Sequence, residues 1–326
     1  MKRTPTRTRI RPRAEIRAGA RTGARAGEVR HWDDGSLDLD AYLARIGHTG
    51  DLSPTPATLR ALHRAHITAV PFENLEIVLG RPVLLGVPAL QDKLVRRARG
   101  GYCYEHSRLF AAVLERLGFG VTALSSRVDM GKGRPEAATH AVLRVATAET
   151  ARTGQVWLCD AGFGSGPLEP VELADGAGVA TGGRAFRLAR RTSELGTGEW
   201  VLRERRAAGA PGEEWRELHS FVPVPQYPVD WEVGNHYVST HPDSPFTGRP
   251  VVLRNGPDVR HGLYGTTLVS TRADGSRRVR ELEPHEVPGV LADTFGIVPA
   301  ADDTKALVTV LERLSVPRTA EGAARG

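Results

Sequence analysis

Three side chains in the middle of the sequence can together perform nucleophilic chemistry: the thiol of Cys103, the imidazole of His140 and the carboxylate of Asp160. A nucleophilic cysteine needs a base that takes its proton, and the base needs a group that orients it. The chain has two cysteines, which are too few for a disulfide framework and do not form a CxxC pair or a Cys/His zinc pattern. The sequence therefore favours covalent catalysis by a thiol and predicts no metal site.

Cys103 lies where a turn runs into a predicted helix. The segment "RGGYCYEHS" (residues 99–107) leads into the helical pattern "SRLFAAVLERLG". Free N–H groups and the helix dipole favour a thiolate there, and such sites lower a cysteine pKa from ~8.5 to roughly 3.5–7.5. Gly100 and Gly101 allow a sharp turn and leave room for an acyl group. The alternative is that Cys103 is a small buried apolar residue, the role that we expect for Cys159 inside the apolar run "VWLCDAGF".

His140 and Asp160 lie at opposite ends of two predicted strands. His140 begins "HAVLRV", and Asp160 ends "VWLCD" twenty positions later. If the strands are neighbours, these ends bring the imidazole and the carboxylate together. Eleven histidines make any single one weak evidence, so the spacing leaves a Cys–His–Asp triad as a hypothesis.

The patterns around these residues predict three sub-domains. Residues 36–118 contain three helical segments and a fourth helix that starts at or near Cys103, with one buried face formed by Cys103, Ser107, Phe110, Leu114 and Leu117. Residues 119–230 contain short β-like runs separated by glycine-rich turns, typical of an antiparallel barrel or strongly curved sheet. Residues 231–326 mix strands and helices. The predicted fold class is α+β: a helical bundle with the nucleophile, a central antiparallel β-barrel with His140 and Asp160, and a mixed C-terminal part.

The charge is concentrated at the N-terminus. Ten basic and two acidic residues give residues 1–31 a charge of +8, whereas the whole chain carries +6, so the remainder carries −2. Residues 1–35 contain almost no large apolar side chains; we expect a disordered, dispensable tail or a translation start placed too early. A basic arm that binds nucleic acid is the less favoured interpretation, and the nearly neutral body is not expected to bind nucleic acid. The sequence has no apolar run of membrane-spanning length and no secretory signal, which predicts a cytoplasmic protein without a membrane partner.

Several motifs together resemble the arylamine N-acetyltransferase family, and the resemblance is closest to its bacterial members. It runs from about Leu37 to near the C-terminus and rests on "PFENLEI", "RGGYCYEHS", "THAVLRV", "DAGFG" and "DWEVGNHYVSTHPDSPF". It implies a helical bundle, a β-barrel and an α/β lid, with the triad arranged as in cysteine proteinases. The catalytic residues carry over as Cys103, His140 and Asp160. The family usually has Asn where this chain has Ser107, and Val where it has Ala161.

The resemblance also implies the chemistry. Acetyl-CoA is the co-substrate, no cofactor is tightly bound, and an arylamine or hydrazine accepts the acetyl group through an acyl-cysteine by a ping-pong route. The backbone N–H of Cys103 is the natural first oxyanion donor. The glycine-rich turn with Gly162, Gly164, Ser165 and Gly166 is expected to meet CoA phosphates. Phe72 and Phe163 match positions near the acyl and amine pocket, although both can equally be core residues. Arg99, Glu73 and Glu105 are expected to form a structural ion-pair network.

Other functions fit the same residues. A cysteine hydrolase of papain or transglutaminase type would use the same triad. An amide synthase that releases a polyketide chain as a macrolactam belongs to the wider family and would load from a carrier protein. A non-catalytic binding protein is disfavoured because all three triad residue types are present. The physiological amine and the oligomeric state are left open.

Overall fold

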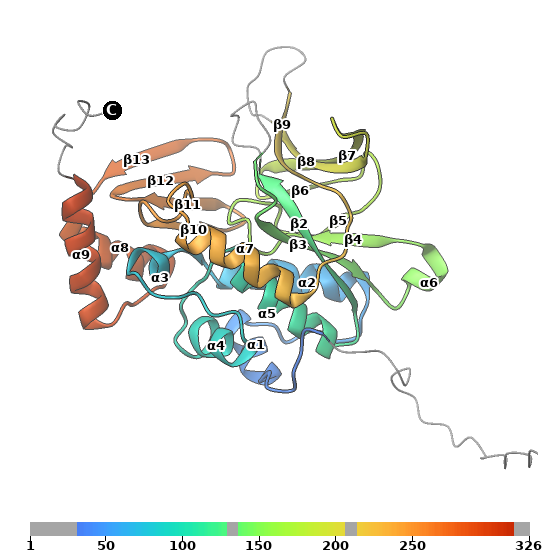
Figure 1. Ribbon diagram of the computed structural model, residues 1–326, viewed down its shortest axis with the longest axis horizontal. Helices are drawn as coiled ribbons and strands as arrows, with labels where there is room; N and C mark the ends of the chain where they lie inside the picture. The colour runs from blue at the N-terminus through green and yellow to red at the C-terminus, as the bar shows by residue number, and fades with distance from the viewer. Residues whose placement is uncertain (1–30, 129–135, 206–213, 316–326) are drawn as a thin grey trace, which may run out of the picture.

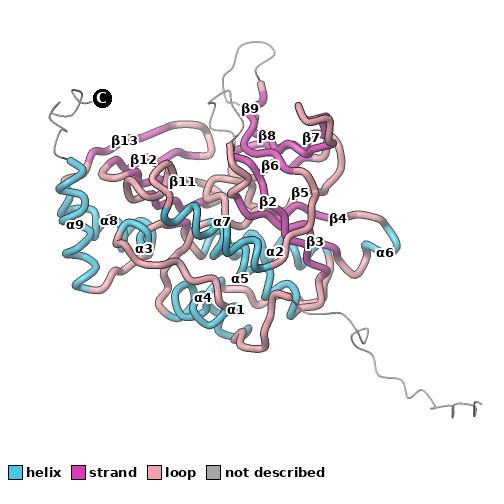
Figure 2. Tube along the Cα trace, viewed as in Figure 1, coloured by secondary structure: helices cyan, strands magenta, loops and turns pink. Residues whose placement is uncertain are grey.

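The structure is a computed structural model, and it describes residues 31–128, 136–205 and 214–315. Most of the helices gather on one side of the molecule, with a barrel of strands above them and a second sheet beside the barrel (Figures 1 and 2). This arrangement confirms the predicted α+β class and the order of helices, barrel and mixed C-terminal part. No helix in the described ranges has the length and apolar character to cross a membrane.

The first part of the chain is helical, and its ends follow the local sequence. The Asp38 side chain accepts from the backbone N–H of Ala41 and so caps the first helix, which stops at Gly47 in the left-handed conformation. We expected the segment "PALQDKLVRRARG" to be a helix that ends at Gly100, but a π-helical segment closes it before Arg97. The helices are α1 (Leu39–Ile46), α2 (Pro56–Ala69), α3 (Leu75–Val78), α4 (Val87–Leu90), η1 (Gln91–Arg96) and α5 (Cys103–Arg116).

Helix α5 is buried on nearly all sides. Residues 109–114 are fully buried, and only positions such as Arg108, Glu115 and Arg116 keep partial exposure. Of the expected face, four residues are buried and Leu117 is half-buried, but burial also extends to the other sides of the helix. The reason is tertiary: strands of the barrel cover one side of α5, while α4 and the long helix α7 (Pro228–Thr240) cover others. A helix enclosed in this way gives its N-terminal residue a fixed position.

The middle of the chain forms an eight-stranded antiparallel sheet in the order β5-β4-β3-β2-β9-β8-β7-β6. The edge strands β5 and β6 come together, so the sheet curls into a nearly closed barrel. Its interior is a separate apolar core that includes Leu124, Val142, Phe186 and Leu202. The strands are β2 (Gly120–Val128), β3 (His140–Ala146), β4 (Val156–Cys159), β5 (Val171–Glu172), β6 (Gly178–Thr181), β7 (Arg184–Thr192), β8 (Gly198–Arg205) and β9 (Trp215–Phe221), with the short helix α6 (Thr150–Thr153) between β3 and β4.

The C-terminal part is a second antiparallel sheet, in the order β1-β10-β11-β12-β13, covered by helices α8 and α9 on one face (Figure 1). We call this sheet the lid sheet. Strand β1 comes from the helical part of the chain, so it ties the lid sheet to the bundle. The elements are β1 (Phe72–Glu73), β10 (Val251–Asn255), β11 (Val259–Tyr264), β12 (Thr267–Arg272), β13 (Arg277–Glu281), η2 (Pro284–Glu286), α8 (Val287–Val290), η3 (Leu291–Phe295) and α9 (Ala301–Ser315).

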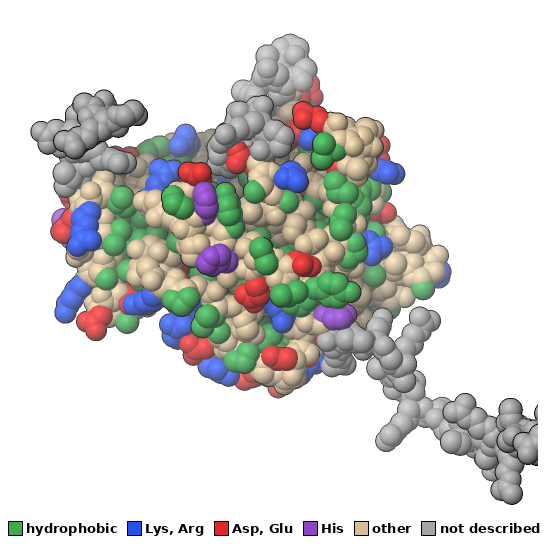
Figure 3. Space-filling model, viewed as in Figure 1, with side chains coloured by type: hydrophobic (Ala, Val, Ile, Leu, Met, Phe, Trp, Pro, Cys, Tyr) green, Lys and Arg blue, Asp and Glu red, His purple; other side chains and the backbone are tan. Residues whose placement is uncertain are grey.

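Helix α7 lies across the front of the molecule in Figure 1 and was not expected as a helix from the sequence. Trp231 on its inner side is fully buried, whereas Val229, Val233 and Tyr237 are exposed on the outer side. Hydrophobic side chains accordingly lie among charged ones on the face seen in Figure 3. The weak contrast between the two sides of α7 explains why periodicity did not identify it.

The folded body begins before Ser36, contrary to the expected tail of residues 1–35. Trp32 is 3% exposed and packs on Trp231 with ring centroids 5.1 Å apart. The Glu115 carboxylate accepts from the backbone N–H groups of residues 31–33 at 2.8–3.0 Å. Asp33 in turn pairs with Arg116. Residues 1–30 of the expected tail lie outside the described residues.

This packing predicts different outcomes for two truncations. Removing residues 1–34 should lower the free energy of unfolding by about 3–5 kcal/mol relative to removing residues 1–30, because the first deletion takes Trp32 out of the core. Urea denaturation of both proteins measures the difference. Equal stability of the two truncated chains would show that Trp32 contributes nothing to the core.

Candidate active site

Strand register brings His140 and Asp160 together. Strands β3 and β4 pair antiparallel, with Leu143 opposite Cys159, so the start of β3 lies beside the end of β4. His140 Nε2 lies 2.9 Å from Asp160 Oδ1, and both side chains are buried. The condition on which the pairing of His140 with Asp160 depended, that the two strands are neighbours, is thus met.

Asp160 is held by side chains from three elements. Its Oδ1 accepts from His140 on β3, its Oδ2 accepts from His219 Nε2 on β9 at 3.0 Å, and its backbone N–H donates to His63 Nε2 on α2 at 3.2 Å. Burial alone would raise the pKa of the Asp160 carboxyl, but His140 and His219 hold it well below its usual range. Asp160 is therefore a carboxylate in the folded protein.

Cys103 completes the cluster at the first residue of α5. Burial alone would lower the pKa of His140, but the Asp160 charge and hydrogen bond, together with the Cys103 side chain, raise it to about 10. Because Nε2 of His140 serves Asp160, its Nδ1 is the nitrogen left for the thiol. The Cys103 Sγ also lies 3.9 Å from the carbonyl oxygen of Thr139. Within the described residues, the backbone N–H of Cys103 has no hydrogen-bond acceptor, so it is free to meet a ligand. Cys159, by contrast, is buried in β4 and its pKa is raised by burial, which agrees with the predicted packing role.

His219 is a member of this cluster that sequence reasoning missed. Its Nδ1 lies 2.8 Å from Ser126 Oγ, which is also 3.1 Å from the carbonyl oxygen of Ser220. Burial lowers the pKa of His219, so its ring is neutral. A neutral ring that donates from Nε2 to Asp160 needs a donor at Nδ1, and the Ser126 hydroxyl supplies it. In the sequence His219 is visible only as a histidine in the strand pattern "WRELHSF". Its link to Asp160 depends on the pairing of β2 with β9, which the sequence does not show.

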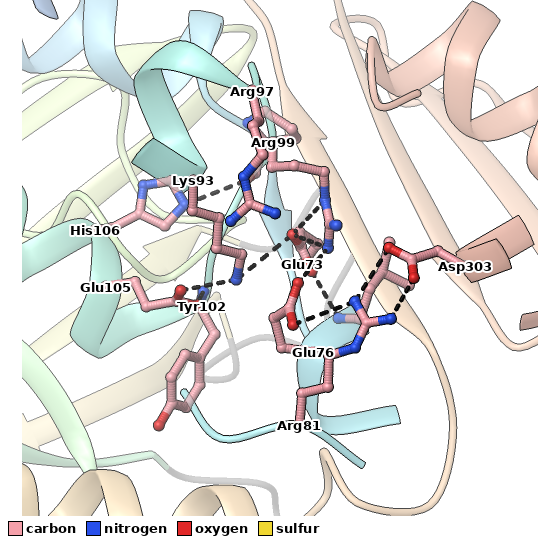
Figure 4. Close-up of polar contacts among 12 residues, drawn as sticks. Glu73, Glu76, Arg81, Lys93, Arg97, Arg99, Tyr102, Glu105, His106 and Asp303 are labelled. Atoms are coloured by element: carbon pink, nitrogen blue, oxygen red, sulfur yellow. Dashed lines mark hydrogen bonds and ion pairs between the residues drawn. The ribbon is translucent and has the colours of Figure 1, made fainter. Parts of the chain in front are cut away.

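A buried ion network supports the turn before Cys103 (Figure 4). Glu105 accepts from the Tyr102 backbone N–H at 3.0 Å, capping α5, and from Lys93 Nζ at 2.7 Å. Arg99 donates to Glu73 at 2.8 Å, and Lys93 lies 3.7 Å from the same carboxylate. These two cations and two anions are all buried, so the predicted network of Arg99, Glu73 and Glu105 is confirmed, with Lys93 added.

The network reaches the lid through three further residues. Glu76 lies 3.4 Å from Arg99 and 3.8 Å from Arg81, and Arg81 pairs with Asp303 of α9. Figure 4 shows these side chains in one continuous group between the helical part and α9. The turn that presents Cys103 is thereby connected to the C-terminal helix.

Two glycines permit close approach around Cys103. A Cβ on Gly100 would lie 2.1 Å from the carbonyl oxygen of Pro71, and one on Gly162 would lie 2.6 Å from the Cα of Cys103. Both distances are too short for any larger residue without moving backbone. The loop after Asp160 therefore rests directly on the first turn of α5. Ser107 donates to the carbonyl oxygen of Ala141 at 3.0 Å and joins α5 to β3 beside His140. Ala161 is buried.

A cleft of about 830 Å³ lies between the barrel and the lid sheet. Phe163 lines it and also contacts the His140 ring, with centroids 5.2 Å apart. Of the predicted glycine-rich turn, Gly164 and Ser165 line the cleft, whereas Gly162 and Gly166 are buried behind it. Phe72 is 6% exposed and packs on Phe246 in the core, so it does not line this cleft.

Three further histidines beside the cluster are held neutral. His63 Nδ1 donates to the carbonyl oxygen of Leu168, and its Nε2 accepts from Asp160. His106 Nε2 donates to the Pro71 carbonyl, so its Nδ1 accepts from His66 Nε2, and His66 Nδ1 accepts from the Tyr42 hydroxyl. Every ring position has one assigned role, and an added proton would break a hydrogen bond. Burial lowers the pKa of His63 and of His106 to about 4 and that of His66 well below its usual value.

Comparisons with known proteins decide the family. The family model described as N-acetyltransferase matches residues 55–304. The arylamine N-acetyltransferase of Mycolicibacterium smegmatis is 39% identical over 267 residues, which are 80% of this chain and 92% of that protein. The chain belongs to the arylamine N-acetyltransferase family.

Solved structures of arylamine N-acetyltransferases have the same fold. That of Nocardia farcinica is 52% identical, superimposes with a TM-score of 0.80 and covers 87% of this chain and 98% of its own. That of Mycobacterium marinum in complex with CoA is 35% identical, with a TM-score of 0.76, and covers 85% of this chain and 99% of its own. The match spans the bundle, the barrel and the lid, so this chain has the whole arylamine N-acetyltransferase architecture.

The neutral histidines predict destabilisation in acid. The unfolded chain takes up protons on His63, His66 and His106 below about pH 6.5, whereas the folded chain does not until about pH 4 or lower. Each pH unit in this window should therefore cost up to about 1.4 kcal/mol per histidine, roughly 4 kcal/mol in all. His140, whose pKa is raised, is protonated in both states there and adds no slope. Urea denaturation at pH 7, 6 and 5 measures the effect, and unchanged stability would contradict the neutral assignment.

The hydrogen bond of His219 predicts a change in His140. His219→Leu removes one donor from Asp160, so the carboxylate keeps more of its negative charge for His140 and holds the proton of that ring more strongly. A hydrogen bond to a charged group is worth about 1.5–3 kcal/mol, so the pKa of His140 should rise from about 10 by at most roughly 1 to 2. NMR titration of isotope-labelled histidines measures it. His219→Gln is the matched control, because its amide can still donate; equal titration of His140 in both variants would refute the assignment.

Proposed function

We propose that this chain transfers an acetyl group from acetyl-CoA to an arylamine or hydrazine through an acyl-cysteine on Cys103. The observation that carries the proposal is the meeting of three residues from separate elements: Cys103 at the start of α5, His140 at the start of β3 and Asp160 after β4. Family membership supplies the substrate classes, since its relatives are named arylamine N-acetyltransferases and one was solved with CoA. A reduced thiol and a supply of CoA fit the cytoplasm as the place of reaction.

In the first half-reaction, Cys103 attacks the thioester carbonyl. His140 holds the thiol proton, and the Asp160 carboxylate stabilises the resulting imidazolium, which agrees with the raised pKa of His140. The unpartnered backbone N–H of Cys103 points to the oxyanion that forms. The carbon–sulfur bond of the donor breaks, His140 gives its proton to the departing CoA sulfur, and acetyl-Cys103 remains.

In the second half-reaction, an amine attacks acetyl-Cys103. His140, now neutral, takes a proton from the attacking nitrogen, and Asp160 holds the ring in the tautomer with the proton on Nε2. The thioester bond breaks, the amide leaves and the Cys103–His140 pair is restored. One transferable proton at His140 Nδ1 therefore serves both halves of the cycle.

Two features of the cleft support the substrate assignment. Phe163 extends from the cleft to the His140 ring, so we assign it to the pocket for the acyl group and the aromatic amine. Gly164 and Ser165 line the same cleft and are the members of the glycine-rich turn that we assign to the CoA moiety. Phe72 packs beside Gly164 and supports this loop from the core.

Intact-protein mass spectrometry with acetyl-CoA tests the proposal. The wild-type chain should gain the mass of one acetyl group, Cys103→Ala should gain none, and Cys159→Ala, the matched control, should be acetylated like the wild type. Adding an arylamine should remove the acetyl group and yield the N-acetyl product. Acetylation of the Cys103→Ala variant would overturn the assignment of the nucleophile.

The same experiment separates the other functions. A cysteine hydrolase would release acetate and CoA at a rate that does not depend on the amine. An amide synthase would remain unmodified by acetyl-CoA and would accept an acyl chain only from a carrier protein. Either outcome would replace the acetyltransferase assignment.

A further inference from the structure

The cleft carries an excess of positive charge at the end formed by the lid sheet. Its lining includes Arg216, Arg260 and Arg277 and one acidic residue, Glu217. Glu217 already accepts from Arg191 at 2.7 Å and from Arg203 at 2.8 Å. The acid in the lining therefore neutralises none of the three arginines.

Arg260 has no ion-pair partner among the described residues. The carboxylate whose charge raises the pKa of Arg260 is Glu204, and its two oxygens are engaged by Arg184 at 2.5 Å and Arg216 at 2.6 Å. Three guanidinium groups thus share one carboxylate, and Arg260 is the one left over. Its side chain is half-buried, and burial and the repulsion of Arg184 lower its pKa. A partly desolvated cation without a partner is costly unless a ligand completes it.

The strand register places Arg260 and Arg277 on the face of the lid sheet that lines the cleft. Arg260 of β11 pairs with Thr271 of β12, and Thr271 pairs with Arg277 of β13, so the three lie in one row across the sheet. Side chains directly opposite each other on neighbouring strands share a face, and all three line the cleft. Arg277 likewise has no ion pair or side-chain hydrogen bond within the described ranges.

The two ends of the cleft differ in chemistry. Phe163 lies at the end that touches His140. Arg260 and Arg277, which we call the arginine row, lie on the lid sheet. A ligand that fits has an apolar or reactive end and a polyanionic end. We propose that Arg260 and Arg277, with Arg216 beside them, bind the phosphates of the CoA donor while its thioester reaches Cys103. The inference rests on the proposed function, because it takes the donor to be acetyl-CoA.

Donor truncation combined with substitution tests this site. Acetyl-pantetheine keeps the thioester and lacks every phosphate, so it cannot use the arginine row. Arg260→Gln should lower kcat/KM for acetyl-CoA about tenfold or more, since a charge-assisted hydrogen bond is lost, and leave kcat/KM for acetyl-pantetheine within about twofold. Arg278→Gln is the matched control: it removes one charge from the same sheet, on β13 next to Arg277, at a position that does not line the cleft, and should change neither value.

Calorimetric binding of CoA itself keeps the test independent of turnover. Arg260→Gln should weaken CoA binding about tenfold and Arg260→Gln with Arg277→Gln more, with a smaller dependence on NaCl than in the wild type. If CoA binds the wild type in this way and Cys103 is never acetylated, the phosphate site stands and the proposed function fails. Equal loss with both donors, or unchanged CoA binding, would overturn the phosphate site.

A carboxylate on the amine substrate is another anion that Arg260 could bind, and a comparison of two amines distinguishes it from the CoA phosphates. If Arg260 binds a carboxylate of the amine instead, Arg260→Gln should lower kcat/KM for 4-aminobenzoate and not for 4-methylaniline, both measured at saturating acetyl-CoA. That result would overturn the assignment to the donor. Equal use of the two amines by the variant and the wild type supports it.

Discussion

The buried carboxylate of Asp160 is the group on which the rest of the site depends. A lone carboxylate cannot be kept ionised inside a protein without donors, and here the donors come from β3, β9 and, through the backbone, from α2. Strand β9 can reach Asp160 only if the barrel closes past β2, and α2 only if the bundle docks on the barrel. The carboxylate thus has its low pKa only in the completely assembled fold. The raised pKa of His140 follows from it, and His140 is the base that faces the Cys103 side chain.

The nucleophile has a second support that is independent of this carboxylate. Glu105 caps the helix that Cys103 begins and is itself neutralised by Lys93, which shares Glu73 with Arg99. Burying four charges gains little stability in total, because desolvation offsets much of the attraction. What the network provides is geometry: each partner fixes the next, from Tyr102 to the helix α9. The position of the thiol is therefore coupled to the lid, although the two are far apart in the sequence.

Local signals in the sequence were enough for the elements that end in recognisable residues. Asp38 and Gly47 set the limits of α1, and His140 and Asp160 marked the strand ends that meet. The sequence did not show features that exist only through long-range packing. His219 acquires its role because β9 pairs with β2. Trp32 acquires its role because it packs on Trp231, which is far away in the sequence. The full burial of α5 likewise depends on which elements surround it, and its own periodicity carries no record of them.

Strand β13 has a further consequence at the rim of the lid sheet. It is an edge strand, all five of its residues are exposed, and it is unusually rich in arginine, with Arg277, Arg278 and Arg280. An open edge of this kind would otherwise offer unpaired backbone groups to another chain. If two copies approached edge to edge, their arginines would face one another and repel. The composition that makes the lid sheet attractive to anions therefore also protects the protein against aggregation through this edge.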